Sequence, residues 1–357
     1  MRKAILSILF TLSIIVTDAQ TTAIPDSNFE QALIDLGHDN VIDGQVLTAN
    51  IDTIQYLNIY YQSISDLTGI ENFTALSELQ CQNNQLTSLD VTQNTALTLL
   101  VCNNNQLTSL DVTQNSALTW LDCGSNQLTS MDVTQNIALR SFYCGFNQLT
   151  SLNVTQNTDL LILDYRFNQL TSIDVTQNTA MSAHHCSGNQ LTSLDLTQNT
   201  ALNILVCDNN QLTCLNIKNG NNSNFGQFGQ FWSTNNPNLT CIEVDDVAWS
   251  TTNWTNIDAQ SSFSISCPSS CIVGTKEISL SNFSLYPNPT TGFINLDLGE
   301  MKQYIKTTLT NSLGQTILTR QFESTDVINI DIDAPKGIYF LQLEVDGEVI
   351  TKKIIKE

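Results

Sequence analysis

A phrase of 21 residues recurs along the middle of the chain without a single insertion. Its most constant part is Asn-Gln-Leu, which begins at Asn84, Asn105, Asn126, Asn147, Asn168, Asn189 and Asn210. The copies follow the pattern Leu-x-x-Leu-x-Cys-x-x-Asn-Gln-Leu-Thr-Ser-Leu-Asp-Val-Thr-Gln-Asn. One copy is too short to bury its own apolar residues, but stacked copies bury them against each other. The period therefore predicts a solenoid, and it favours binding over catalysis as the first hypothesis of function.

The spacing within one copy predicts a short strand. Leu100 and Cys102 lie two positions apart, as inward-facing strand residues do, so Val101 and Asn103 point outward. Asn105 ends the strand, and its amide can bond backbone groups that turn away from the sheet. Repeated in every copy, this asparagine predicts a ladder of stacked amides.

The second half of each copy predicts a return to the core. Leu107, Leu110 and Val112 are expected to point inward. Asn115 precedes Ser-Ala-Leu, a favourable place for an asparagine that caps a short helical turn.

A period of 20 to 29 residues with Leu-x-x-Leu-x-Leu-x-x-Asn-x-Leu is the leucine-rich-repeat signature, here with Cys in the third apolar slot. The segment Ile64–Leu76 belongs to an earlier copy and resembles the repeats of bacterial internalin-like proteins. Leu239–Val244 repeats the Leu-x-Cys phrase and is expected to be the last strand. We therefore expect about eight to nine repeats of 21–22 residues, built from parallel strands joined by turns or short 3-10 helices.

The flanking segments differ from the repeats. Residues 1–19 are typical of a secretory signal peptide, and residues 20–56 predict a cap with a helix over Phe29–Leu36 that begins at Asp26 or Ser27. The predicted organisation is listed here in chain order: 1–19 signal peptide, 20–56 N-terminal cap, 57–217 leucine-rich repeats, 218–272 last repeat and C-terminal cap, 273–281 linker, 282–357 C-terminal domain.

Residues 282–357 predict a small antiparallel β-sandwich. Apolar residues alternate at Ile328, Ile330 and Ile332, and again around Ile338–Leu343. The segment opens with Phe283-Ser-Leu-Tyr-Pro-Asn-Pro-Thr-Thr-Gly, followed by Ser-Leu-Gly-Gln, Pro-Lys-Gly-Ile-Tyr-Phe and Lys-Lys-Ile-Ile-Lys. This order of motifs resembles the sorting domain of the type IX secretion system of Bacteroidetes bacteria. The resemblance implies contact with the secretion machinery, and either release or attachment at the cell surface. The alternative is an ordinary appended sandwich domain.

The strongly negative net charge of the chain argues against some classes of binding partner. The net charge is −21, and between the signal peptide and Lys218 the only basic residues are Arg140 and Arg166. A surface of this kind repels nucleic acid and anionic membranes. After signal removal, no further segment predicts a transmembrane span.

The ten cysteines fall into two groups. Six share one inward slot, which Tyr165 fills in the remaining copy: Cys81, Cys102, Cys123, Cys144, Cys186 and Cys207. Buried Cys packs as a small hydrophobic residue, so we interpret this slot as packing rather than a metal or redox ladder. Cys214, Cys241, Cys267 and Cys271 lie near the C-terminal cap, with Cys241 a candidate member of the ladder. A disulfide is expected there, and the sequence leaves its pairing open.

Catalytic and metal-binding patterns are weak. His184 fills an inward Leu slot and His185 points outward, so adjacent His184, His185 and Cys186 face different sides. Asp39–Gly44 resembles a calcium loop, but it lacks an oxygen side chain at Val41 and has Asn50 where the bidentate Glu should stand, so it favours a turn. The recurrent Asp90, Asp111, Asp132, Asp174 and Asp195 suit turn capping, with calcium along that edge as the alternative. We therefore expect no enzyme activity, no metal and no cofactor.

The copies differ mainly at their outward strand positions, where a group of aromatic and charged residues gathers in four neighbouring copies. These candidate ligand-binding residues are Trp120, Asp122, Arg140, Tyr143, Phe146, Asp164, Arg166, Phe167 and His185. Exposed aromatics beside Arg are the usual composition of a binding hot spot. The alternative is drift among repeats, with Arg140 and Arg166 pairing with Asp122 and Asp164.

These observations predict an exported protein that recognises an extracellular protein or glycan through its concave sheet. Resemblance to internalin-like proteins implies adhesion to a cell or matrix. The alternative is a structural surface spacer without a specific ligand, and the aromatic group argues against it.

Overall fold

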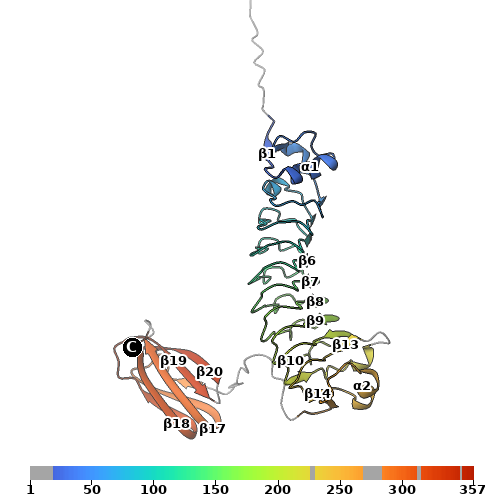
Figure 1. Ribbon diagram of the computed structural model, residues 1–357. Helices are drawn as coiled ribbons and strands as arrows, with labels where there is room; N and C mark the ends of the chain where they lie inside the picture. Colours follow the sequence, from blue (N-terminus) through green and yellow to red (C-terminus); the bar gives the residue numbers. More distant parts are fainter. Residues whose placement is uncertain (1–18, 226–229, 268–283, 312–314, 346–347) are drawn as a thin grey trace, which may run out of the picture. The chain divides into compact units, whose positions relative to one another are not determined.

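The computed structural model describes residues 19–225, 230–267, 284–311, 315–345 and 348–357. The chain divides into two compact units near residue 271, drawn in blue to yellow and in orange to red in Figure 1. Three predicted features lie outside the described residues: the signal peptide up to residue 18, the linker 273–281 and Cys271.

The N-terminal unit is a leucine-rich-repeat solenoid built on a nine-stranded parallel sheet (Figure 1). Each strand has three residues and pairs in register with the equivalent residues of the next copy. The strands are β3 (Tyr56–Asn58), β4 (Glu78–Gln80), β5 (Leu99–Val101), β6 (Trp120–Asp122), β7 (Ser141–Tyr143), β8 (Ile162–Asp164), β9 (Ala183–His185), β11 (Ile204–Val206) and β13 (Gln230–Trp232). The predicted fold of this part is confirmed.

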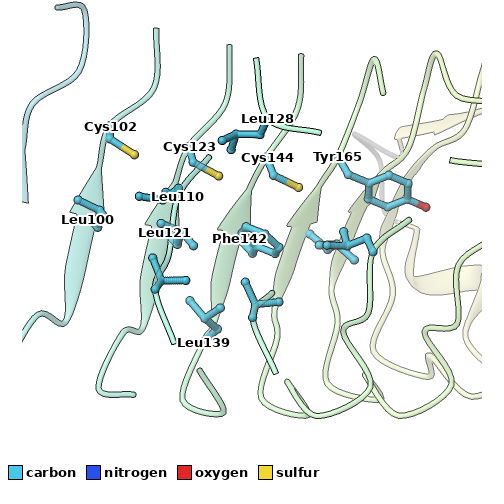
Figure 2. Packing of buried hydrophobic residues seen from close by; sticks show 14 of the residues in the cluster. Leu100, Cys102, Leu110, Leu121, Cys123, Leu128, Leu139, Phe142, Cys144 and Tyr165 are labelled. Atoms are coloured by element: carbon cyan, nitrogen blue, oxygen red, sulfur yellow. The ribbon is translucent and has the colours of Figure 1, made fainter. Parts of the chain in front are cut away.

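The core consists of columns of equivalent side chains, one from each copy. Figure 2 shows two of them, with Leu100, Leu121 and Phe142 in one and the cysteine sulfurs in the other. The six cysteines of this slot are buried and unpaired, as expected for side chains that serve as packing. Tyr165 continues the cysteine column with a full aromatic ring (Figure 2).

The predicted asparagine ladder is confirmed. Asn105 donates from Nδ2 to the carbonyls of Cys81 (3.1 Å) and Cys102 (3.0 Å), while its Oδ1 accepts the amide of Leu86 at 3.0 Å. The same three bonds recur at Asn126, where they join neighbouring copies. Each amide satisfies backbone groups that the turn would otherwise leave buried and unpaired.

Asn115 does not cap a helical turn, so that prediction was wrong. The turn after Val112 is not helical, and Asn115 is fully buried. Its Nδ2 donates to the carbonyls of Val91 (3.0 Å) and Asn94 (2.9 Å) in the preceding copy. The side chain is a donor across copies rather than an acceptor within its own, and its equivalents form a second amide ladder.

The aspartate series caps turns, as predicted. Asp111 accepts the backbone amide of Thr113 at 2.9 Å and its hydroxyl at 2.7 Å. Asp90 and Asp132 make the same pair of bonds two residues along the chain. These hydrogen bonds lower the pKa of Asp90, Asp111 and Asp132.

The segment before the first repeat contains a helix and a small antiparallel sheet of β1 (Thr21–Ala23) and β2 (Gln45–Leu47). Helix α1 (Ser27–Asp35) begins after Asp26, whose side chain accepts the amides of Asn28 and Phe29. Phe29 is buried and its ring stacks on Phe73 at 6.1 Å, so the helix joins the solenoid core. That this segment serves as a cap stays a prediction.

The stretch Asp39–Gly44 ends in a turn held by a buried carboxylate. Glu30 Oε1 accepts the backbone amides of Asp43, Gly44 and Gln45 at 2.7–3.1 Å. This contact explains why an acidic residue is tolerated inside helix α1 with almost no exposure.

The prediction for Leu239–Val244 was wrong in its place in the fold. Strand β14 (Cys241–Glu243) pairs with β12 (Cys214–Asn216) and β15 (Ser262–Ser264), in a second parallel sheet that also includes β10 (Ser193–Asp195). The nine-stranded sheet instead ends at β13 (Gln230–Trp232). Cys241 is thus no member of the cysteine ladder.

The C-terminal end of the solenoid carries the disulfide expected from the sequence. Cys241 bonds to Cys267, 26 residues later, and Cys214 is also disulfide-bonded. Helix α2 (Val247–Asn253) follows β14, and Trp254 after it stacks on Phe231 at 4.3 Å. Short 3-10 turns occur at Thr48–Asn50, Ile70–Asn72 and Asn222–Asn224.

The C-terminal unit is an antiparallel sheet of five strands, which confirms the antiparallel strands expected there, while the sandwich itself stays a prediction. The strands are β16 (Ser284–Tyr286), β17 (Phe293–Asn311), β18 (Thr316–Asp331), β19 (Gly337–Val345) and β20 (Glu348–Lys356). Strand β17 pairs with β16, β18 and β19. Ile328, Ile330 and Ile332 are buried, whereas Ile338 and Phe340 lie on the exposed face of β19. Strands β17 and β18 are much longer than the short strands expected.

Within the residues that the structure describes, neither helix has the length and hydropathy needed to cross a bilayer.

Candidate binding surface

The outward face of the nine-stranded sheet carries parallel rows of side chains, each row with one residue from every copy. One row places Asp122, Tyr143, Asp164 and His185 on neighbouring strands, and a second row contains Trp120. Backbone bonds continue the pairing beyond the strands to Phe146 and Phe167. We call the nine predicted residues the aromatic patch, and the structure brings them onto four adjacent copies.

The aromatic rings of this patch contact each other in two pairs. The rings of Trp120 and Tyr143 lie 5.2 Å apart, and those of Phe146 and Phe167 stack at 4.7 Å. Trp120 is 38% exposed, Phe146 50% and Phe167 46%, so about half of each surface remains available. Exposed rings that adjoin in this way form a continuous surface rather than scattered single residues.

Phe146 and Phe167 also adopt an unusual backbone conformation. Their φ angles are +57° and +52°, in the left-handed region. The same turn position holds Asn83, Asn104 and Asn209, types that tolerate positive φ. A residue with a bulky side chain is disfavoured there by about 1–2 kcal/mol. Local strain of this kind concentrates at functional sites, which is an argument for the patch that exposure alone does not provide.

Gly188 makes room for the second of these rings. It occupies the equivalent turn position in the next copy, with φ +68°. A Cβ atom built there would lie 2.5 Å from Cδ1 of Phe167 and 2.8 Å from Cε1. The aromatic stack thus ends against a residue without a side chain.

The charged residues of the patch differ in their pairing. Arg166 binds Asp164 through both ends of its guanidinium, with Nη2 to Oδ2 at 2.6 Å and Nε to Oδ1 at 3.1 Å. This bears out half of the pairing alternative. Arg140 is exposed and forms no ion pair with any described residue, while Asp122 accepts only the amide of Gly124 at 3.1 Å.

Burial shifts the pKa of three side chains in this row. Desolvation raises the pKa of Asp122, and the nearby Asp164 carboxylate adds to the shift. Desolvation also raises the pKa of the Tyr143 hydroxyl, which lies between these two acids, and lowers the pKa of His185. Asp122 is therefore a partly desolvated carboxylate, whose charged form is less favourable than in water.

The two adjacent histidines face opposite sides, as predicted. His185 lies in the outward row, whereas His184 is fully buried. His184 Nε2 lies 2.9 Å from the hydroxyl of Tyr165, which fills the cysteine slot of the preceding copy. Burial lowers the pKa of His184 to about 3, so the imidazole is neutral and serves the core.

Sequence reasoning missed three exposed tyrosines at the start of the same face. Tyr56 is 51% exposed on β3, and Tyr60 and Tyr61 follow that strand at 46% and 69%. The rings of Tyr60 and Tyr61 meet edge-on at 5.7 Å. We call these residues the tyrosine cluster. They could have been found by extending the comparison of outward positions to the first copy, which lacks the Cys.

A pocket of about 540 Å³ lies among the turns of the first copies and shares no residue with the aromatic patch. Its carboxylates include Asp66, Asp90 and Asp111, each of which accepts hydrogen bonds from the threonine two residues later. These acids are therefore already engaged in capping turns.

Comparison with known proteins separates the two units. Residues 284–357 match the family described as the secretion system C-terminal sorting domain. The C-terminal unit is a secretion sorting domain. It directs the protein through type IX secretion to the cell surface or the extracellular space.

The solenoid is similar to Listeria monocytogenes internalins. A stretch of 70 residues is 39% identical to internalin J of serotype 4b, which covers 20% of this chain and 8% of that protein. The functional domain of InlJ, described as including a cysteine ladder, aligns over 96% of this chain and all of its own length, with 22% identity and a TM-score of 0.46. Internalin C2 aligns over 70% and 99%, with 21% identity and a TM-score of 0.46.

Proposed function

We propose that this exported protein recognises an extracellular protein or glycan, without covalent chemistry, through the outward face of its nine-stranded sheet. The observation that carries the proposal is the pair Phe146 and Phe167. Two phenylalanines stand half-exposed and stacked at a turn position where neighbouring copies have Asn, Ser or Gly. Packing of the fold does not require them, and the strained backbone favours other residues.

The rest of the aromatic patch supplies the contacts that such recognition needs. Trp120 and Tyr143 offer ring surface, and Asp122 offers a partly desolvated carboxylate. The Arg166 guanidinium is fixed by Asp164, so its remaining donors are oriented before a ligand arrives. Rigid aromatic and arginine side chains are the residues that dominate binding energy in interfaces.

Adhesion is the use to which we assign this binding. The sorting domain brings the protein to the cell surface or the medium, where a rigid array can meet another cell or matrix. The second candidate is a structural spacer, which the near-identical turns and ladders would serve equally well. The aromatic patch is the observation that favours recognition.

The test is a binding screen of the purified chain against glycan arrays and immobilised extracellular-matrix proteins. We expect a saturable signal that falls at least about tenfold when Trp120, Tyr143 and Arg166 are all changed to Ala. Ile137→Ala is the matched control, because Ile137 is 60% exposed in a turn outside the sheet. Unchanged affinity in a correctly folded triple variant would remove the patch from the proposal.

A further inference from the structure

The tyrosine cluster and the aromatic patch lie on the same face of the nine-stranded sheet, three to four strand spacings apart. Tyr56 and Trp120 occupy the same row on β3 and β6, three strand spacings apart. At about 4.8 Å per strand, this separation is about 14 Å. Tyr61 and Phe146 share the turn row four spacings apart, about 19 Å. The tyrosine cluster and the aromatic patch are thus two aromatic platforms. The part of the sheet face that lies between them, on β3 to β5, is called the strip.

The strip between the platforms is rich in side-chain amides, which stand beside Glu78 and the two apolar residues Leu99 and Val101. The amides on β3 to β5 and the turns after them are Asn58, Gln80, Gln82, Asn83, Asn103 and Asn104. Each amide offers both donors and an acceptor. Gln82 Oε1 and Asn103 Oδ1 are buried and have no hydrogen-bond partner among the described residues, although both side chains are partly exposed. Each oxygen therefore lacks a donor, which a ligand hydroxyl that reached it would supply.

Charge is nearly absent from this strip. Glu78 is the one charged side chain in the outward strand rows of β3 to β5, and no Lys or Arg lies there. Within this strip a sulfated or otherwise anionic ligand would find no cation to bind, because Arg140 and Arg166 lie beyond it in the aromatic patch. A folded protein partner would need a central apolar cluster surrounded by a polar rim, whereas the apolar side chains of this strip are two, Leu99 and Val101, among six amides.

We propose that this face binds a neutral, linear polysaccharide of β-linked pyranose units, which lies across the strands from the tyrosine cluster to the aromatic patch. Aromatic rings stack on the apolar faces of sugar rings, and amides bond the hydroxyls. The strand spacing is close to the length of one pyranose unit, so successive sugars meet successive copies. This inference rests on the proposed function and names the class of its ligand.

The tyrosine cluster also contains an aromatic residue with a left-handed backbone, as the aromatic patch does. Tyr61 has φ +56°, the left-handed conformation that Asn adopts at the equivalent position in other copies. It is also the most exposed large aromatic side chain among the described residues. An aromatic residue has thus replaced the favoured type at both ends of the strip.

The test is affinity electrophoresis of the purified full chain in gels that contain a mixed-linkage β-glucan, a xylan or a galactomannan, with heparin as the anionic comparison. We expect retardation by at least one neutral polysaccharide and none by heparin. Tyr61→Asn should weaken that binding about fivefold, and Gln82→Ala together with Asn103→Ala should weaken it further. Asn is the residue found at this turn in other copies, so Tyr61→Asn retains the fold. Ile137→Ala should bind as the wild type does.

Failure of this inference is distinguishable from failure of the proposed function. If no neutral polysaccharide retards the chain, or if Tyr61→Asn leaves retardation unchanged, the polysaccharide assignment is overturned. The proposed function still stands in that case if an immobilised matrix protein binds and the triple variant at Trp120, Tyr143 and Arg166 does not. If neither class binds, both fail.

Discussion

The regular copies of the solenoid and its central copies have the same inward-facing packing and hydrogen bonds, but they differ in their outward-facing side chains. Around Leu100 the outward and turn positions carry Val and Asn, whereas two copies later they carry Tyr and Phe. The asparagine ladder runs through both regions with the same hydrogen bonds. Stability thus fixes the interior, and the residues that depart from the repeat outside are the ones that need another explanation.

The asparagine ladder should be equally important in both regions. Asn126→Leu removes the bonds that Asn126 makes to Cys102 O, Cys123 O and the Leu107 amide. The Leu107 amide is then buried without a partner, whereas Asn105 and Asn147 still donate to the two carbonyls. We expect a loss of at least about 3 kcal/mol in the free energy of unfolding, measured by urea denaturation. Asn168→Leu in a central copy should cost about the same.

Gln127→Leu is the control for that change, because Gln127 is exposed beside Asn126. Its effect should stay within about 0.5 kcal/mol. A loss at Gln127 as large as that at Asn126 would contradict the ladder's role.

Tyr165 and His184 are buried residues that replace the Cys and Leu of most other copies. Their contributions to the free energy of unfolding should be coupled. His184→Leu alone leaves the Tyr165 hydroxyl buried without its partner, at a cost of about 1–3 kcal/mol. Tyr165→Cys combined with His184→Leu restores the residue types of the other copies. The double variant should be more stable than the two single losses predict, by about 1–2 kcal/mol. Additive losses would show that the pair is uncoupled.

His184 also gives the solenoid a dependence on pH. Its pKa is about 3 in the folded state and about 6.5 when unfolded, so the unfolded chain binds the proton more readily. Stability is therefore full above about pH 6.5 and falls as the pH drops toward 3. Between pH 6.5 and 5 the wild type should lose more stability than the variant that combines Tyr165→Cys with His184→Leu. Parallel curves would contradict a neutral buried imidazole.

Comparing two glycine-to-alanine variants distinguishes the energetic cost of a contact with the Phe167 ring from the cost of the left-handed backbone. Gly188→Ala introduces a Cβ 2.5 Å from the Phe167 ring at φ +68°, whereas Gly220→Ala at φ +77° meets nothing within 4 Å. Both variants place a Cβ in the left-handed region, which costs about 1–2 kcal/mol, and Gly188→Ala should lose more stability because of the added contact with Phe167. The difference in melting temperature measures the clash with Phe167, and equal losses would mean that the ring moves away freely.

The smallest effect that we expect is an increase in stability. Phe146→Asn relieves a left-handed backbone cost of about 1–2 kcal/mol and forfeits a ring pair worth about 0.5–1.5 kcal/mol. We expect a net rise of about 0.5 kcal/mol in thermal unfolding experiments. A clear destabilisation would show that Phe146 is retained for packing.

The interior of the solenoid was predictable because every copy repeats the same packing problem. Leu100, Cys102 and Asn105 were placed correctly by spacing alone. Asn115 was misjudged because an amide donates as readily as it accepts, and only the stacked copy reveals which group it meets. Leu239–Val244 was misjudged because Leu-x-Cys occurs twice in that copy, and the Leu212-Thr-Cys214 phrase is the one repeated.

The outward surface was predictable only in part. Spacing assembled the nine patch residues, but it gave no sign that Phe146 and Phe167 stack or that their backbone is left-handed. The Asn, Ser and Gly at equivalent positions were the available signal. The tyrosine cluster was missed because its copy is separated from the next by 22 residues and has Ile59 in place of Cys.

The central claim is that the outward departures serve binding and not stability, so the decisive measurement compares both properties in one variant. The variant combines Phe146→Asn with Phe167→Asn, and it is screened against glycan arrays and matrix proteins beside the wild type. The account predicts equal or higher thermal stability, together with a loss of about tenfold in affinity for whatever the wild type binds. Unchanged binding with reduced stability would contradict it.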